Sequence, residues 1–201
     1  MDETRFKNMI GNKKKEINLI IGVTGHPASG KDAVAEYLEE KGFAHLSGGN
    51  ILREKMKEKG MSVDRTSVRE FAKEMRAKVG NHYPYEELAD MVSGDTVVSG
   101  LRNLAEMEVF KRKFPDSFLC VGVDCPLEVR YERAASRGRI GDDVTFERFK
   151  EEEERERLED SGSHEVDKVI AEAHAVLDNS GTKEELFEKI EELLAKWRET
   201  T

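Results

Sequence analysis

The chain has 201 residues, enough for one substantial α/β core but few for two independent domains. Its formal net charge of −9 at pH 7 argues against a general nucleic-acid-binding protein, so its arginine clusters must serve local purposes. No apolar run approaches a membrane span, and the charged residues 1–16 lack the apolar core of a signal peptide. We therefore expect a cytoplasmic protein that binds neither nucleic acid nor a membrane.

Apolar runs alternate with helical patterns along the chain, which predicts an α/β fold with a mainly parallel sheet covered on both faces. Strands are predicted at residues 18–23, 43–46, 96–99, 118–123 and 175–177. Helices are predicted at residues 31–41, 51–59, 68–79, 85–92, 103–113, 127–136, 146–158 and 183–197. The last helix opens with Thr182 and Glu185, the spacing of a capping box.

The first predicted strand runs into two glycines five residues apart and a lysine, directly before a helical pattern. Such glycines let the backbone wrap around an anion, and the helix N-terminus adds partial positive charge. The spacing predicts a loop that binds a nucleotide triphosphate, with Lys31 reaching the terminal phosphates. The loop residues are Gly25, His26, Pro27, Ala28, Ser29, Gly30, Lys31 and Asp32.

Asp32 stands where the strict phosphate-loop pattern has serine or threonine. A carboxylate there can serve Mg²⁺ directly or through water, because hard oxygen ligands suit that ion. Asp32 is therefore our candidate metal ligand. The alternative is an ordinary strand-to-helix turn with a surface lysine, in which Asp32 serves the first helical turn.

Two arginine-rich regions interrupt the alternation of strands and helices. Residues 47–92 contain several helical patterns and no strand pattern, so they are expected to form a cap over the sheet edge. After the fourth strand, Arg130, Arg133 and Arg137 share one helix face, and none has an acidic residue at helical spacing. This row is best explained by a bound anion; the alternative is a solvated face or one paired across the chain. A hinged lid is expected to begin after it.

From about residue 17 onward, the chain resembles the nucleoside monophosphate kinase group of P-loop kinases, especially small adenylate-kinase-related and dephospho-coenzyme-A-kinase-like proteins. Residues 47–53, Ser-Gly-Gly-Asn-Ile-Leu-Arg, are similar to the group's acceptor-binding segment Ser-Thr-Gly-Asp-x-Leu-Arg. Residues 99–102, Ser-Gly-Leu-Arg, resemble the segment Asp-Gly-Ile-Arg that follows the third strand. The resemblance implies that the acceptor is bound by Ser47, Gly48, Asn50, Arg53 and Arg102.

On the donor side, Arg133 and Arg137 resemble the arginines that open the lid of these kinases. Residues 179–182 are similar to the loop near the donor adenine, which implies ATP contacts from Asn179 and Gly181. The resemblance further implies ATP and Mg²⁺ as cofactors and one three-layer kinase domain over residues 1–201. Within it we expect a charged extension at 1–16, an acceptor-binding helical insertion at 47–92 and a lid region at 137–160.

Two positions depart from the group's pattern. Many relatives end the third strand with an aspartate near the magnesium shell, and Ser99 stands there instead. We hypothesise that the carboxylate has moved across the metal site to Asp32. Asn50 replaces the group's aspartate on the acceptor side, so the identity of the acceptor stays open.

The predicted activity is transfer of the γ-phosphate of ATP to a nucleoside or deoxynucleoside monophosphate, in a monomer or homodimer. Its catalytic groups would be Lys31, Arg53, Arg102, Arg133 and Arg137. One alternative is a dephospho-coenzyme A kinase, whose hydroxyl acceptor needs a base that the sequence does not clearly offer. Another is a nucleotide-binding regulator without turnover, since Ser99 and Asp32 are both off-pattern. His26 could touch a phosphate or merely fill the loop. The other histidines, His45, His82, His164 and His174, show no triad or metal spacing.

Overall fold

The computed structural model describes residues 18–137, 145–158 and 165–200. Its sheet has five parallel strands in the order β2-β3-β1-β4-β5. The strands are β1 (Ile20–Thr24), β2 (Ala44–Ser47), β3 (Thr96–Leu101), β4 (Phe118–Asp124) and β5 (Ala175–Asp178). The predicted α/β fold with a five-stranded parallel sheet is confirmed.

The described helices follow the predicted ones closely, with one addition. They are α2 (Lys31–Glu40), α3 (Gly48–Glu58), α4 (Arg65–Val79), α5 (Tyr85–Asp90), α6 (Leu104–Lys113), α7 (Leu127–Arg137), α8 (Phe146–Leu158), α9 (Val166–Ala171) and α10 (Lys183–Thr200). The sequence did not predict α9, because six residues are too few for a helical period to stand out. Packing supports it instead, since Val169 is fully buried.

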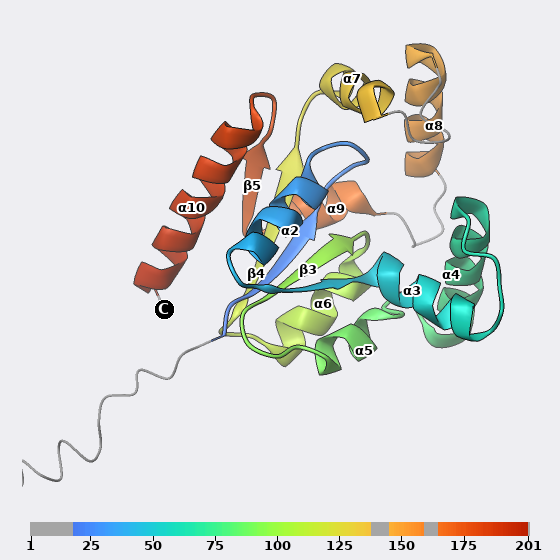
Figure 1. Ribbon diagram of the computed structural model, residues 1–201, viewed down its shortest axis with the longest axis horizontal. Coiled ribbons are helices and arrows are strands. Elements are labelled where there is room, and N and C mark those ends of the chain that lie inside the picture. The colour runs from blue at the N-terminus through green and yellow to red at the C-terminus, as the bar shows by residue number, and fades with distance from the viewer. Residues whose placement is uncertain (1–17, 138–144, 159–164, 201) are drawn as a thin grey trace, which may run out of the picture.

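Helices cover both faces of the sheet and give three layers (Figure 1). One core joins Ile21 and Val23 of β1 to apolar residues of α2 and α10. A second core joins Ile20 of the same strand to α6 and α9 through Phe110 and Val169. Alternate residues of β1 therefore face opposite layers, as in a strand buried on both faces.

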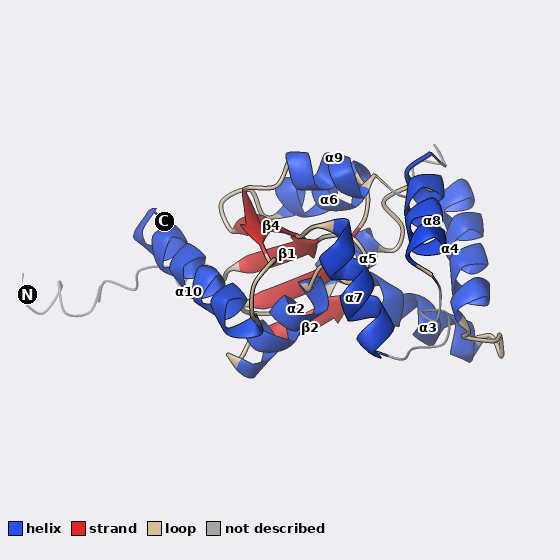
Figure 2. Ribbon diagram, turned by 90° about the horizontal axis from the view of Figure 1, so that it is seen from above, coloured by secondary structure: helices blue, strands red, loops and turns tan. Residues whose placement is uncertain are grey.

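The carboxyl end of β1 lies between β3 and β4, and the chain runs from it into α2. In open parallel sheets, ligands bind beyond the carboxyl ends of the strands, where the strand order changes direction. Figure 2 shows α7 above this region, with α3, α4 and α8 gathered at one end of the molecule. The sequence-predicted loop, which follows β1, thus lies beside α7, with α3, α4 and α8 toward one end of the molecule. We call α3 and α4 the cap helices.

The closing helix α10 begins with the predicted capping box. The Thr182 amide donates to Glu185 Oε2 at 3.1 Å, and the Glu185 amide donates to Thr182 Oγ1 at 3.2 Å. The buried side chains of Leu186 and Ile190 then seat the helix on the sheet. Within the described ranges, we find no helix with both the length and the apolar character needed to cross a membrane.

Candidate functional site

The sequence-predicted phosphate loop connects β1 to α2 in a tightly wrapped turn. Gly30 adopts a φ of +103°, and a Cβ added there would overlap the amide group of Asn179. Ala28 adopts a φ of +62°, which is strained for a residue with a side chain. The amide of Ser29 donates to the carbonyl of His26 at 3.2 Å. These contacts produce a compact loop at the carboxyl end of β1.

The loop is held in place from the end of β5, where the sequence placed donor contacts. Asn179 is 4% exposed and donates from Nδ2 to the Ser29 carbonyl at 2.7 Å. Asn179 therefore braces the loop from behind. Gly181 lies nearby and accepts a hydrogen bond from Arg133 Nη2 at 3.0 Å. The structure thus brings three predicted ATP-binding residues, Asn179, Gly181 and Arg133, to one side of the loop.

Lys31 and Asp32 begin α2 at the mouth of the loop. Lys31 Nζ lies 3.4 Å from the His26 carbonyl and 3.9 Å from Asp32 Oδ1. The Asp32 side chain is 55% exposed. Gly30 is the N-cap of α2, and no side chain of the described residues caps the helix there, an arrangement that suits an anionic ligand. The buried Ser29 hydroxyl also lacks a hydrogen-bond partner in the described part of the chain.

These features fit a triphosphate with Mg²⁺. A helix N-terminus without a side-chain cap, a lysine and an unsatisfied hydroxyl all suit phosphate oxygens. No three His, Cys, Asp or Glu side chains of the described ranges are grouped so that they could hold a metal ion on their own. Magnesium commonly takes one carboxylate together with substrate phosphates, so Asp32 alone is compatible with that ion.

The predicted acceptor residues lie on the β2 side of the loop. Ser47 ends β2, and Gly48 starts α3 so close to Tyr85 that an added Cβ would lie 2.5 Å from its Oη. Arg53 and Asn50 are exposed on α3, with Arg53 Nη1 3.4 Å from Asn50 Oδ1. The guanidinium group of Arg53 is therefore presented to solvent rather than built into the core.

Arg102 follows β3. Its side chain is exposed, and hydrogen bonds hold the backbone at and just before this residue. Its amide donates to Glu106 Oε2 at 2.7 Å. Just before it, the Gly100 carbonyl accepts a hydrogen bond from Tyr85 Oη at 2.6 Å. Burial raises the pKa of Tyr85 well above its usual range, so this phenol stays protonated as a donor.

The arginine row on α7 serves more than one purpose. Arg130 is 4% exposed, and its Nη1 lies 2.5 Å from Glu153 Oε2 of α8. Its neutralising anion is thus a carboxylate of this chain, which corrects the expectation that the whole row faces a ligand. Arg133 donates to Gly181, as described above, and Arg137 is exposed at the end of α7. The predicted lid loop at 138–144 lies outside the described residues, as does 159–164.

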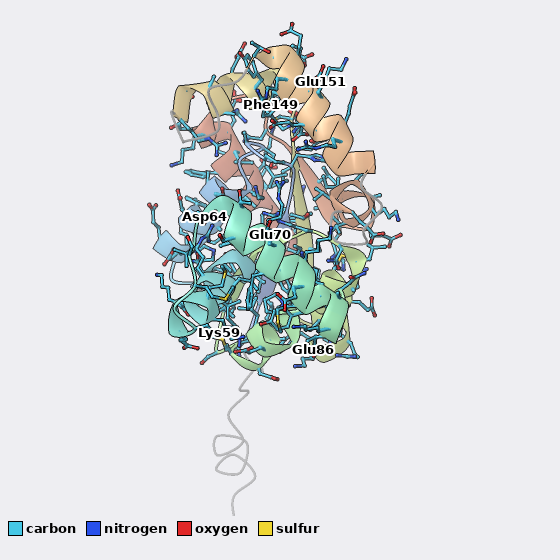
Figure 3. The ribbon with its side chains drawn as sticks, turned by 90° about the vertical axis from the view of Figure 1, so that its right-hand side faces the viewer. Lys59, Asp64, Glu70, Glu86, Phe149 and Glu151 are labelled. Carbon is cyan, nitrogen blue, oxygen red and sulfur yellow. The ribbon has the colours of Figure 1, made fainter. Side chains whose placement is uncertain are left out.

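His26 connects the predicted phosphate loop to the helices α8 and α9. Its Nε2 lies 2.8 Å from Asp167 Oδ1 of α9, and its Nδ1 lies 3.9 Å from Glu153 Oε2. His26 is 8% exposed and packs between the loop and these helices, and its contact with a phosphate stays a prediction. Figure 3 shows α8 by its labelled Phe149; this ring packs with Ala28 of the loop and Ala134 of α7.

A second group of contacting polar side chains runs from Ser99 of β3 through His45 of β2 to Glu39 of α2. His45 Nε2 lies 2.9 Å from Ser99 Oγ, and His45 Nδ1 lies 3.4 Å from Glu39 Oε2. Ser99 pairs with Val23, the second-to-last residue of β1, so it lies near the carboxyl end of that strand. His45 therefore lies between a hydroxyl and a carboxylate in space, although the sequence shows no triad spacing around it. Strand pairing brings these residues together, and no sequence spacing reveals it.

Comparisons with known proteins identify the family and the fold of the chain. A family model described as an AAA domain matches residues 21–159. A UPF0200 protein of Thermococcus gammatolerans is 32% identical over 185 residues, which cover 89% of this chain and 95% of the relative. A UPF0200/UPF0201 protein of Archaeoglobus fulgidus is 32% identical over 183 residues. That alignment covers 88% of this chain but spans only about half of the relative, 55% of its length.

Among solved structures, shikimate kinase from Acinetobacter baumannii, in complex with shikimate, superposes with a TM-score of 0.58 at 17% identity. The match covers 92% of this chain and 97% of that one, and it shows a shared fold. The resemblance to small P-loop kinases is thereby confirmed at the level of the fold. The chain belongs to the UPF0200 family, carries the AAA domain and has the fold of the small P-loop kinases.

Proposed function

We propose that this chain transfers the γ-phosphate of ATP to a nucleoside or deoxynucleoside monophosphate. The observation that carries the proposal is the position of two exposed arginines, Arg53 and Arg102, on the acceptor side of a loop built around Lys31. Phosphoryl transfer needs little covalent help but much positioning and charge neutralisation. When bound, Mg·ATP supplies the phosphoryl group and part of that neutralisation.

The residues of the chain divide the remaining work. The loop amides and Lys31 bind the donor's phosphates, while Arg53 and Arg102 hold the acceptor phosphate in line. Arg133 and Arg137 neutralise charge from the α7 side and help to exclude water. An acceptor phosphate is already anionic, so this reaction needs no strong general base.

The direct experiment is a coupled ADP-release assay over ribo- and deoxynucleoside monophosphates and dephospho-coenzyme A. We expect one or a few monophosphates to raise ADP release far above the rate with ATP alone. If ATP binds but none of these acceptors stimulates turnover, the nucleotide-binding regulator becomes the better description.

The Ser99–His45–Glu39 chain favours a second candidate, a kinase whose acceptor is a hydroxyl group, such as dephospho-coenzyme A kinase. His45 Nε2 lies 2.9 Å from the Ser99 hydroxyl, and Glu39 Oε2, 3.4 Å from Nδ1, favours the tautomer that leaves the lone pair on Nε2. Ser99 could then take a proton from the acceptor hydroxyl and pass its own to His45. This arrangement supports the second candidate, because it would supply the base that a hydroxyl acceptor needs.

His45→Ala separates the two candidates. With a monophosphate acceptor we expect kcat to stay within about threefold of the wild type, because that reaction needs no base. With a hydroxyl acceptor we expect kcat to fall by roughly 100-fold, the usual size of a lost general base. Glu39→Gln should give a smaller loss in the same direction, and Glu40→Gln, the exposed neighbour on α2, should give none. A large loss with a monophosphate would contradict the first candidate's mechanism.

A separate prediction concerns the metal. Asp32→Ala should raise the Mg²⁺ concentration needed for half-maximal activity by about tenfold, because an oxygen ligand is lost. Asp32→Ser should recover part of the loss through its hydroxyl group. Glu36→Ala, an exposed carboxylate one turn further along α2, is the control. An unchanged magnesium dependence in Asp32→Ala would return Asp32 to the role of a helix-start residue.

A further inference from the structure

Glu106 is a fully buried carboxylate whose two oxygens bind two different segments of the chain. Its exposed fraction is 0%. Oε1 lies 3.1 Å from Arg76 Nη2 of α4, and Oε2 accepts the amide of Arg102 at 2.7 Å. One side chain on α6 thus connects a cap helix to the backbone of an exposed arginine beside the loop.

The cap helices have a small core of their own, which makes this connection significant. Leu52 and Met56 of α3 pack against Phe71 and Ala72 of α4, in a cluster separate from the two cores of the sheet. The apolar contacts of α4 therefore hold it mainly to α3. The ion pair between Arg76 and Glu106 crosses from this unit to α6, which lies against the sheet.

Further polar contacts hold the same turn. Asn103 accepts the Glu106 amide through Oδ1 at 3.0 Å and donates through Nδ2 to the Asn81 carbonyl at 3.2 Å. Asn81 follows α4 directly in the chain, after Gly80. The end of α4 and the turn after β3 are therefore joined at two points, through Arg76 and through Asn81.

Arg76 and Arg102 both affect the ionisation of Glu106. Burial raises the pKa of Glu106 to about 7, while the guanidinium groups of Arg76 and Arg102 favour its charged form. Tyr85 also faces the carboxylate and is neutral. Glu106 Oε1 pairs with Arg76 Nη2, while the buried Arg76 Nε has no hydrogen-bond partner in the described ranges.

We propose that Glu106 is a positioning residue that ties Arg102 to the cap helix α4 through Arg76. Arg102 is then correctly placed for the acceptor only when α4 is seated against α6. This inference rests on the proposed function, in which Arg102 binds the acceptor phosphate. It assigns to α4 a part in acceptor binding that passes through the backbone rather than through direct contact.

The test uses the full chain and the acceptor that the ADP-release panel identifies. Glu106→Gln keeps an oxygen for the Arg102 amide but removes the charge that holds Arg76. We expect kcat/KM for the acceptor to fall by about 30-fold, mostly through KM, with the ATP dissociation constant measured without acceptor within about twofold. Glu86→Gln is the matched control, because it removes an exposed ion pair between α5 and Arg112 of α6.

A double variant keeps the proposal testable if Glu106→Gln folds poorly. Arg76→Met with Glu106→Gln removes both buried charges together, a change that proteins often tolerate. It retains the bond to the Arg102 amide but removes the ion pair that ties α4 to Glu106 through Arg76. We expect its melting temperature to recover while the acceptor KM stays high. Recovery of both would show that the pair is merely structural and would overturn the proposal.

Arg102→Ala distinguishes failure of this inference from failure of the proposed function. If Arg102→Ala lowers acceptor kcat/KM but the Glu106 variants match Glu86→Gln, only the positioning role is rejected. If Arg102→Ala has no effect, the acceptor role of Arg102 in the proposed function fails as well. Equal losses for ATP and acceptor in Glu106→Gln also contradict the proposal, because Glu106 contacts only the acceptor side.

Discussion

Lys31→Ala is expected to lower ATP turnover by about 1,000-fold while the protein stays folded, a loss typical of one preorganised charge at a transition state. At about 1.36 kcal/mol per decade, this corresponds to roughly 4 kcal/mol of lost stabilisation. The side chain is 16% exposed at the mouth of the loop and belongs to neither apolar core, so its removal leaves no cavity there. The measurements are single-turnover ADP formation and the melting temperature.

Lys41→Ala provides the matched control for this experiment. Lys41 caps the other end of α2, where its Nζ pairs with Glu191 at 2.9 Å on the surface. Losing that exposed pair should change stability by less than about 1 kcal/mol and leave turnover unchanged. If Lys31→Ala remained as active as this control in a well-folded protein, the phosphate-loop assignment would be rejected.

Arg53→Ala is expected to lower kcat/KM for the acceptor by at least about 100-fold, with ATP affinity in the absence of acceptor nearly unchanged. A charge-assisted, bidentate bond to a phosphate is worth a few kcal/mol where water is excluded. Within the described residues, Arg53 is exposed on α3 and makes a long 3.4 Å contact with Asn50, so a phosphate can engage it without disrupting the cap. Initial rates at varied acceptor and direct ATP titration are the measurements.

Two further variants sharpen the result for Arg53. Arg53→Lys keeps the charge but loses the planar fork, so it should fall between the wild type and Arg53→Ala. Lys57→Ala, an exposed cation one turn along the same helix, should behave like the wild type. Equal weakening of ATP and acceptor, or a drop in melting temperature that accounts for the loss, would mean that Arg53 only braces the cap.

Local sequence patterns predicted much of the fold, because parallel strands buried on both faces have nearly continuous apolar sequences. Residues 18–23 and 118–123 were predicted as strands, and the structure places β1 and β4 there. The tight turn between β1 and α2 was also predictable, since all of its residues are contiguous, and its phosphate-binding role stays a prediction. The capping box at Thr182 could be predicted for the same reason, because its two residues lie three positions apart.

The parts that could not be predicted depend on residues that meet only after folding. Glu153 neutralises Arg130 from a different helix, so the row on α7 looked free of carboxylates when only helical spacing was considered. His45 reaches Ser99 because β2 pairs with β3. Nothing near Glu106 in the sequence points to Arg76, which lies 30 residues earlier in the chain.

The strand order also constrains how the chain acquires its structure as it is synthesised. β1 is made first among the described strands but occupies the centre of the sheet, where Ile20 pairs with Thr96 and Phe118. Both edges of this apolar strand thus await partners encoded far downstream, and such long loop closures slow folding. Until β3 and β4 have both left the ribosome, at least one edge of β1 is unpaired, and chaperones shield unpaired hydrophobic segments of this kind.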